Sequence, residues 1–319
     1  MNESIDSLPD IEQIHAAAAR IAPHARVTPV MRSAALDALS GAELYFKCEH
    51  LQRGGAFKFR GACNAVWALN DAQAAHGVVT HSSGNHGNAL ALAAATRGIA
   101  AHVVVPEGAV RAKVEAIERA GAILHRCAPT QAAREAMCAE VQRATGAELV
   151  HPYADTRVMA GQGTVALELL LQAPELDALI TPVGGGGLAS GVAIAAHAAN
   201  PGLALFGAEP QGADDAVQSL ARGERVSGIA PDTLCDGLRA LIGVSNLDAL
   251  RRHQVQVISV TDAETIAAMQ LIWSELKQVV EVSSATVLAA VLRQPERFAG
   301  RRLGLVITGG NVDLLALPW

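Results

Sequence analysis

Short runs of apolar, often β-branched residues alternate with helical stretches along most of this chain. The first series predicts strands at 77–81, 101–105, 122–126 and 148–151, with helices at 85–97, 108–120 and 130–145 between them. The second series predicts strands at 177–183, 203–208, 255–260 and 303–307, with helices at 161–171, 188–199, 262–276 and 284–293. Such alternation is typical of parallel sheets joined by right-handed crossovers. The sequence therefore predicts an α/β protein of two lobes, each a parallel twisted sheet flanked by helices.

Composition narrows the functional class. The 319 residues are 50% hydrophobic and 18% charged, enough for one large core or two smaller ones. A net charge of -6 and only 3% aromatic residues argue against nucleic acid as a partner. Apolar runs break before the ~18 residues needed to span a bilayer, and the acidic N-terminus lacks signal-peptide order. The five cysteines show no paired spacing, so we expect reduced thiols in a cytoplasmic protein.

A single lysine follows two glycines in the run Gly54-Gly55-Ala56-Phe57-Lys58. The apolar helical pattern after it places Lys58 in the first turn of a buried helix, where the helix dipole disfavours a cation. Burial also favours the neutral amine and lowers the pKa of a lysine. Neutral, desolvated lysines are the ones that form Schiff bases. The alternative is a lysine whose stem lies on apolar surface while its head reaches water.

Three glycine-rich turns are predicted between a strand and a helix: around Ser83, at 184–187 and around Thr308. In open α/β sheets, ligands bind beyond the carboxyl ends of the strands. The four consecutive glycines at 184–187, with the helix that follows, form an anion site suited to phosphate. The same loop also fits the dinucleotide pattern G-x-G-x-x-A, with Glu209 as a ribose acceptor, so by itself it is also compatible with a nicotinamide-dependent oxidoreductase.

The turn at 82–87 reads Ser-Ser-Gly-Asn-His-Gly. Its hydroxyls, backbone amides and the Asn85 side chain can bind a carboxylate or a ring oxygen, whereas a helix cap needs only one serine. Thr308 supplies a neutral hydroxyl at the end of the last predicted strand. A capping role for Thr308 is the alternative.

In their order along the chain, these motifs resemble those of the fold type II pyridoxal-phosphate enzymes, in the branch of serine/threonine dehydratases and serine racemases. The resemblance covers nearly the whole chain and implies a fold like that of the tryptophan synthase β-subunit. It implies a large cofactor-binding domain made of residues 1–70 and 152–319, and a small mobile domain of residues 71–151. It also implies a homodimer that acts on a small amino acid, without nucleic acid or membrane partners.

The resemblance also implies roles for single residues. The residues implied to hold the cofactor are Phe57, Lys58, Asn85, Gly184, Gly185, Gly186, Gly187 and Thr308. The residues implied to bind the substrate carboxylate are Ser82, Ser83, Asn85 and His86. Lys58 would carry pyridoxal 5'-phosphate as a Schiff base and then take the α-proton as general base. Ser83 would lie on the other face of the α-carbon, where a second base permits racemisation.

The resemblance also implies a partner for the pyridine nitrogen of the cofactor and a site for a metal ion. Thr308 would face the pyridine nitrogen, and a hydroxyl cannot keep that nitrogen protonated, which suits β-elimination. The segment that begins at Glu209 resembles the divalent-cation site of the serine racemase branch. The Glu209 and Asp215 carboxylates and the Ala213 carbonyl would offer oxygen ligands to Mg²⁺ or Ca²⁺. A solvated acidic helix start is the alternative.

The predicted function is dehydration and deamination of a β-hydroxy amino acid to a keto acid and ammonia. Serine, threonine, 3-hydroxyaspartate and 3-phenylserine are the candidate substrates, and an amino acid racemase is the alternative on the same scaffold. Two features point to different substrates. Ala240 and Leu241 follow Asp236-Gly237 where serine racemases have serines, which favours a larger or apolar group. Arg134 aligns roughly with an arginine near the substrate in some members of this family, which favours a substrate with an acidic side chain. The alternative is that Arg134 is an exposed arginine on a helix.

Overall fold

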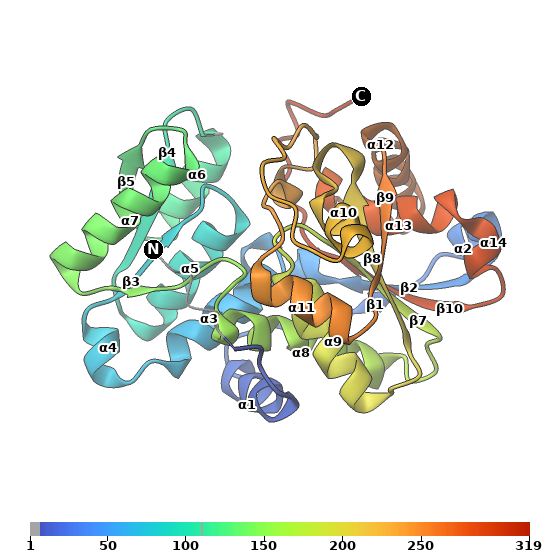
Figure 1. Ribbon diagram of the computed structural model, residues 1–319, viewed down its shortest axis with the longest axis horizontal. Helices are drawn as coiled ribbons and strands as arrows, with labels where there is room; N and C mark the ends of the chain where they lie inside the picture. Colours follow the sequence, from blue (N-terminus) through green and yellow to red (C-terminus); the bar gives the residue numbers. More distant parts are fainter. Residues whose placement is uncertain (1–6, 110) are drawn as a thin grey trace.

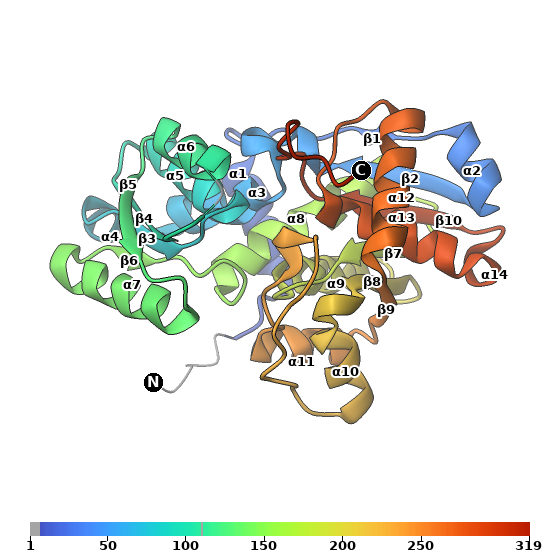
Figure 2. The same cartoon turned by 90° about the horizontal axis from the view of Figure 1, so that it is seen from above.

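The computed structural model describes residues 7–109 and 111–319 and contains two lobes, seen side by side in Figure 1. One lobe is built on a four-stranded sheet of order β5-β4-β3-β6 and the other on a six-stranded sheet of order β1-β2-β10-β7-β8-β9. Both sheets are covered by helices (Figures 1 and 2). The predicted two-lobed α/β architecture is confirmed.

The small lobe follows the first predicted series closely. All its strand pairs are parallel. Its strands are β3 (Val78–His81), β4 (Ala101–Pro106), β5 (Ile123–Cys127) and β6 (Glu148–Leu149). Its helices are α4 (Asp71–Ala75), α5 (Asn85–Arg97), α6 (Arg111–Arg119) and α7 (Gln131–Thr145). The β3 strand ends at the turn that contains Ser83, so this turn lies at the carboxyl edge of the sheet.

The large lobe carries the other strands and helices. Its strands are β1 (Val30–Met31), β2 (Glu43–Cys48), β7 (Ala178–Pro182), β8 (Ala204–Pro210), β9 (Gln256–Val260) and β10 (Arg302–Ile307). Its helices are α1 (Ile11–Ile21), α2 (Ala34–Ser40), α3 (Lys58–Ala68), α8 (Thr156–Gln172), α9 (Gly187–Ala199), α10 (Asp215–Arg222), α11 (Val244–Arg252), α12 (Asp262–Leu271), α13 (Val282–Arg293) and α14 (Pro295–Phe298). The β1–β2 pair is antiparallel and the other pairs are parallel.

The structure differs from the sequence-based expectations at three places. Helix α8 begins at Thr156, earlier than the predicted 161, because Asp155 caps its first turn. Helix α12 ends at Leu271 and passes into a π-helical turn at Ile272–Leu276. The turn around Thr308 is not followed by a helix in the described residues after β10, so the prediction of three strand–turn–helix units holds for only two.

Helix α3 packs directly on α8 through glycine. A Cβ atom on Gly161 would lie 2.6 Å from the Gly61 Cα, so only two glycines allow this approach of the helices. Residues of α3 also share a buried cluster with Ala89 and Leu90 of α5 and Val78 of β3. Helix α3 therefore contacts both lobes, and its first residue is Lys58.

All five cysteines are buried and unpaired, as the absence of paired spacing predicts. No helix in the described part of the chain is long and apolar enough to cross a membrane.

Candidate active site

Backbone pairing brings the Lys58 segment beside the end of β10. Ala56 forms an antiparallel bridge with Gly309. The Phe57 N–H donates to the Thr308 carbonyl at 2.9 Å, and the Gly310 N–H donates to the Gly55 carbonyl at 3.0 Å. Two motifs some 250 residues apart in sequence therefore meet in one place.

The Lys58 amine has a single hydrogen-bond partner among the described residues. Its Nζ donates to the Pro152 carbonyl at 2.9 Å and lies 5.0 Å from the centroid of the Phe57 ring. Although part of the side chain is accessible, protein surrounds the amine, and this desolvation lowers the pKa of Lys58 to about 8. A fraction of the amine is therefore neutral near physiological pH, far more than for an ordinary lysine, which fits a nucleophile and a proton acceptor.

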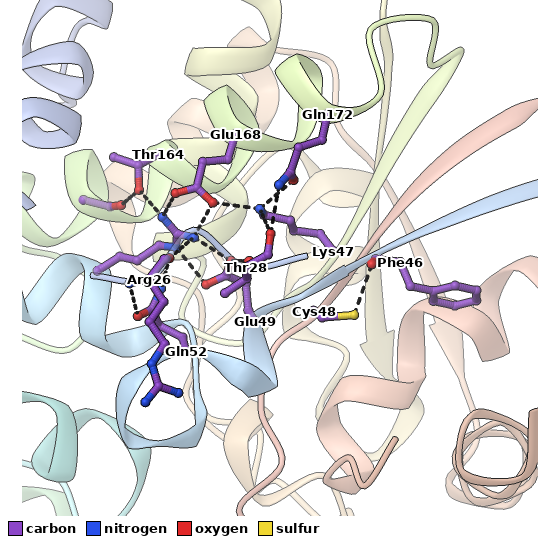
Figure 3. Close-up of polar contacts among 12 residues, drawn as sticks. Arg26, Thr28, Phe46, Lys47, Cys48, Glu49, Gln52, Thr164, Glu168 and Gln172 are labelled. Atoms are coloured by element: carbon purple, nitrogen blue, oxygen red, sulfur yellow. Dashed lines mark hydrogen bonds and ion pairs between the residues drawn. The ribbon is translucent and has the colours of Figure 1, made fainter. Parts of the chain in front are cut away.

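A buried ionic network holds the start of α3 in place. The Arg60 guanidinium donates to both Glu49 oxygens at 2.7 and 2.8 Å and to both Glu168 oxygens at 2.7 and 2.8 Å. Lys47 donates to Glu168 at 2.7 Å, and Figure 3 shows Lys47, Glu49 and Glu168 converging on one centre. Two cations thus balance two anions at the base of the Lys58 helix. Because charge-assisted pairs are directional, they fix the position of its first turn.

The glycine loop at 184–187 presents free backbone N–H groups. The four residues are buried, and none of their N–H groups has an acceptor within the part of the chain that the structure describes. Buried N–H groups are nearly always paired, so four in a row at the start of α9 indicate an anion that binds there. A Cβ atom on Gly185 would lie 2.4 Å from the Tyr153 ring, and Gly186 has φ +89°. These are positions that only glycine fits.

The turn after β3 offers a second set of free donors. The Ser82 Oγ accepts from the Gly84 N–H at 3.4 Å, while the N–H groups of Asn85, His86 and Gly87 at the start of α5 have no acceptor among the described residues. A carboxylate would satisfy them, favoured by the helix dipole. The His86 ring itself is turned to the Val150 carbonyl at 3.1 Å, and burial holds its pKa well below the usual value. Only the His86 backbone is thus available to an anion.

Thr308 is buried, and its hydroxyl lies 3.0 Å from the Ser284 Oγ. The Ser284 hydroxyl donates to the Gly309 carbonyl at 2.7 Å and accepts from the Gly309 N–H at 2.8 Å. Because the one Ser284 proton is already used, Thr308 is the donor of this pair. Its proton is therefore available for a neutral nitrogen if the hydroxyl rotates.

The sequence reasoning missed Glu281, which no motif marks. Its buried carboxylate accepts from the Asn85 amide at 2.9 and 3.2 Å and so links α5 of the small lobe to the start of α13. Burial and the charge of Asp236 raise the pKa of Glu281 to about 7, although Lys113 and the hydrogen bond from Asn85 oppose the shift. The only local signal is an acidic residue just before a helix, which is common on protein surfaces.

The structure brings Glu209 and Asp215 into one buried region beside the glycine loop. Glu209 accepts from the Ala216 and Val217 N–H groups, and Asp215 accepts from the Ile242 N–H at 2.7 Å. Burial raises the pKa of both carboxyls, that of Glu209 to about 9. No group of three or more His, Cys, Asp or Glu side chains in the described ranges is arranged to hold a metal. Two buried carboxyl groups close together offer the oxygen ligands that a hard ion such as Mg²⁺ or Ca²⁺ prefers.

A cluster of polar rings and one arginine lies at the carboxyl end of the small sheet. His81 and His151 stack edge to face with centroids 5.4 Å apart, and burial lowers the pKa of both, that of His151 to about 4. Arg134 lies near enough to His81 to lower its pKa further through its charge. The Arg134 Nε is buried without a partner among the described residues. Arg134 is therefore not the freely exposed arginine of the alternative reading.

The segment that contains Ala240 and Leu241 lies beside the glycine loop. Ala240 and Leu241 are half-buried in the segment between η4 (Asp236–Leu238) and α11. This segment packs on the glycine loop, where a Cβ atom on Gly184 would lie 3.0 Å from the Leu238 Cα.

Comparisons with known proteins agree with this geometry. The family described as "Pyridoxal-phosphate dependent enzyme" matches residues 21–309. The β-hydroxyaspartate dehydratase of Paracoccus denitrificans is 47% identical over 312 residues, which cover 98% of this chain and 99% of the relative.

Two solved structures extend the comparison. Maize serine racemase is 46% identical, with a TM-score of 0.94 over 96% of this chain and 94% of that one. A pyridoxal 5'-phosphate-dependent aspartate racemase is 35% identical, with a TM-score of 0.90 over 98% of this chain and 99% of that one. The relatives thus include both a dehydratase and racemases.

Proposed function

We propose that this chain, which belongs to the family of pyridoxal-phosphate-dependent enzymes, dehydrates and deaminates 3-hydroxyaspartate to a keto acid and ammonia. The observation that carries the proposal is the combination of four free glycine amides with a desolvated lysine amine. The dehydratase relative at 47% identity supports the reaction type and the substrate.

The residues present fit pyridoxal phosphate. Its phosphate matches the free N–H groups at 184–187, and its aldehyde matches the Lys58 amine. Phe57 and Asn85 would contact the ring, and Thr308 would donate to the ring nitrogen. When bound, the cofactor supplies an electron sink that makes the α-proton of an amino acid acidic.

The residues of the site would bind the substrate carboxylate and take the α-proton. The α-carboxylate of the substrate would bind the free N–H groups of the turn at 85–87 together with the Ser82 and Ser83 side chains. Lys58 would take the α-proton, because its lowered pKa keeps part of the amine neutral. Loss of the β-hydroxyl follows, and the released product hydrolyses to the keto acid and ammonia.

Arg134 supports an acidic substrate. A buried guanidinium nitrogen without a partner is costly, and a second substrate carboxylate would satisfy it by a charge-assisted hydrogen bond. The other candidates, serine, threonine and 3-phenylserine, carry no such group. We therefore place 3-hydroxyaspartate first among the four.

Racemisation is the second candidate function. It is favoured by Ser83, whose hydroxyl has no hydrogen-bond partner among the described residues, and by the similarity to maize serine racemase. A divalent cation held by Glu209, Asp215 and the Ala213 carbonyl belongs to the same proposal. Its role would be structural, since Asp215 binds the segment that packs on the glycine loop.

We also propose a homodimer formed through an apolar patch on the large lobe, defined by Leu51, Val279, Leu315 and Trp319, all of which are exposed. Trp319 contacts Trp273 edge to face, and Gly310 lies between the Val279 backbone and His50, next to Leu51 in the chain. Light scattering of the wild type and of Leu315→Glu would test it, and a dimeric variant would contradict this location.

A substrate panel tests the function. Each candidate amino acid and its β-stereoisomer is supplied to the holoenzyme with and without EDTA, and keto acid, ammonia and optical rotation are followed. We expect 3-hydroxyaspartate to be preferred, and Arg134→Gln to lower kcat/KM for it by about 10- to 100-fold while changing that for serine little. Preference for serine in the wild type would overturn the substrate assignment.

The cofactor link is tested by Lys58→Met. The wild type should absorb at ~410 nm and lose this band with borohydride, and the variant should lack it. Ammonia release should fall at least ~10³-fold. Lys277→Met is the matched control, because Lys277 is exposed and outside the site. A colourless wild type that stays inert after reconstitution would refute the proposal.

A further inference from the structure

Glu281 lies where the two lobes meet around the site. It is 4% exposed, and its N–H donates to the Gly309 carbonyl at 3.0 Å. A Cβ atom on Gly309 would lie 2.6 Å from its Oε1, so the carboxylate rests directly on the backbone beside Thr308. From this position it accepts both hydrogen bonds from the Asn85 amide.

Asn85 is held on both sides of its amide. The Asn85 Nδ2 donates to Glu281, while its Oδ1 accepts from the Asn311 Nδ2 at 2.9 Å. Asn311 in turn donates to the Gly54 carbonyl at 2.8 Å, four residues before Lys58. The Asn85 amide is thus part of a chain that runs from α13 through the small lobe to the segment that leads into Lys58.

The orientation of the Asn85 amide follows from the chemistry of its partners. The ionised Glu281 carboxylate only accepts hydrogen bonds and the Asn311 amide nitrogen only donates, so while Glu281 is ionised the Asn85 NH₂ must face it and the Asn85 carbonyl must face Asn311. The NH₂ group has two protons, and because the two Glu281 oxygens belong to one carboxylate, a single N–H is shared between them at 2.9 and 3.2 Å. The second proton has no acceptor among the described residues and is free to donate to an oxygen of a bound ring.

We propose that Glu281 is a positioning residue that fixes the flip of the Asn85 amide and so makes Asn85 a hydrogen-bond donor to the cofactor. This inference rests on the proposed cofactor site and adds to it a residue that acts through Asn85. Without an acceptor-only partner, the amide can turn over and present its carbonyl to the ring oxygen, where two acceptors repel. Glu281 also ties the first turn of α5 to the large lobe.

The test is a double-mutant cycle on cofactor affinity, measured by titrating apoprotein with pyridoxal phosphate. The variants are Glu281→Gln, Asn85→Ala and the double variant, with Glu275→Gln in the preceding π-helical turn as the exposed control. Glutamine keeps the shape but offers both a donor and an acceptor, so it should weaken binding ~10-fold. In the Asn85→Ala background the same change should have no further effect. Glu275→Gln should leave affinity unchanged.

A second readout separates positioning from damage to the fold. Amide hydrogen exchange at 85–89 should be faster in Glu281→Gln apoprotein than in the wild type, with the exchange of β7 and α9 unchanged. Equal weakening of cofactor binding in both backgrounds, or no weakening in the wild-type background, would overturn the inference and leave the proposed function intact. Absence of cofactor binding in the wild type would instead remove the proposed function itself.

Discussion

At the scale of the residue, the site depends on charged groups held in an environment that disfavours their charge. Desolvation lowers the pKa of Lys58 to about 8, and burial together with the charge of Asp236 raises the pKa of Glu281 to about 7. Neither group has an ion-pair partner among the described residues, in contrast to Arg60 nearby. Perturbed groups without partners are typical of sites that complete their bonding with a ligand.

Glu281 should make the stability of the apoprotein depend on pH. The groups that face it are Asp236, Lys113, the Asn85 amide and the Asn311 N–H. The pKa of Glu281 is about 7 in the folded chain, against about 4.3 for an unfolded glutamate. The folded state binds this proton more tightly than the unfolded state does. The resulting stabilisation of the fold is complete below about pH 4.3 and is lost as the pH rises through about 7.

The Glu281→Gln variant has no ionisable side chain at this position, so it should not lose stability in this way as the pH rises. We expect its free energy of unfolding, relative to the wild type, to increase between about pH 5 and about pH 8. Denaturant unfolding of both apoproteins at several pH values measures the difference, with Glu275→Gln as control. A constant difference across this range would show that Glu281 does not titrate as described.

At the scale of the element, the glycine loop depends on steric fit, whereas α3 depends on buried ion pairs. The loop needs the absence of side chains. Gly185→Ala places a Cβ atom 2.4 Å from the Tyr153 ring, so either the ring or the loop must shift. We expect cofactor affinity to fall at least ~10-fold and the free energy of unfolding to fall by about 1–3 kcal/mol. Gly202→Ala, where the nearest atom is 3.4 Å away, should change neither.

Helix α3 needs its buried charges to be balanced. Arg60→Met leaves the fully buried Glu49 without its cation and should cost about 3–5 kcal/mol of stability. Arg252→Met removes an exposed i,i+4 pair with Asp248 and should cost at most about 1 kcal/mol. Thermal or denaturant unfolding of the two variants compares them directly. Equal losses would mean that the network contributes no more than a surface pair.

At the scale of the whole molecule, the small lobe joins the large lobe across the site through exposed and buried links. Lys113 of α6 pairs with Asp236, and Asn85 of α5 bonds to Glu281. We propose that residues 71–151 move as one unit when substrate binds, and that these contacts form in the closed state. Lys113→Met should raise KM for substrate by no more than about fivefold, because an exposed pair contributes little. The increase should shrink at high salt, which screens the pair in the wild type. A change in kcat alone would contradict a role in closure.

Most of the fold could be predicted from the sequence because it is set by local pattern. Helix α5 has its predicted bounds, and α1 begins at a capping box of Asp10 and Gln13, a pattern that is visible in the sequence. Strand β1 and the short helices α2, α4, α10, α11 and α14 were missed, because a segment of a few residues shows too few repeats of its period to be recognised.

The sequence marked Lys58, the glycine loop, the turn at 82–87 and Thr308 as candidate site residues, whereas no local pattern marked Glu281 or Pro152. Glu281 and Pro152 reach the site through long-range packing, which one sequence does not reveal. The orphaned Arg134 nitrogen likewise became visible only when α7 was placed against β3.

The close contact between Gly61 and Gly161 has a consequence for ligand choice. It binds the amine-bearing helix to the large half of the molecule, while the carboxylate anchor at 85–87 belongs to the other half. A molecule with both an amino and an acidic group can contact both lobes at once. A simple amine can contact only the lobe that carries Lys58. Discrimination between amino acids and other amines would then arise from the span of the ligand, before any bond is broken.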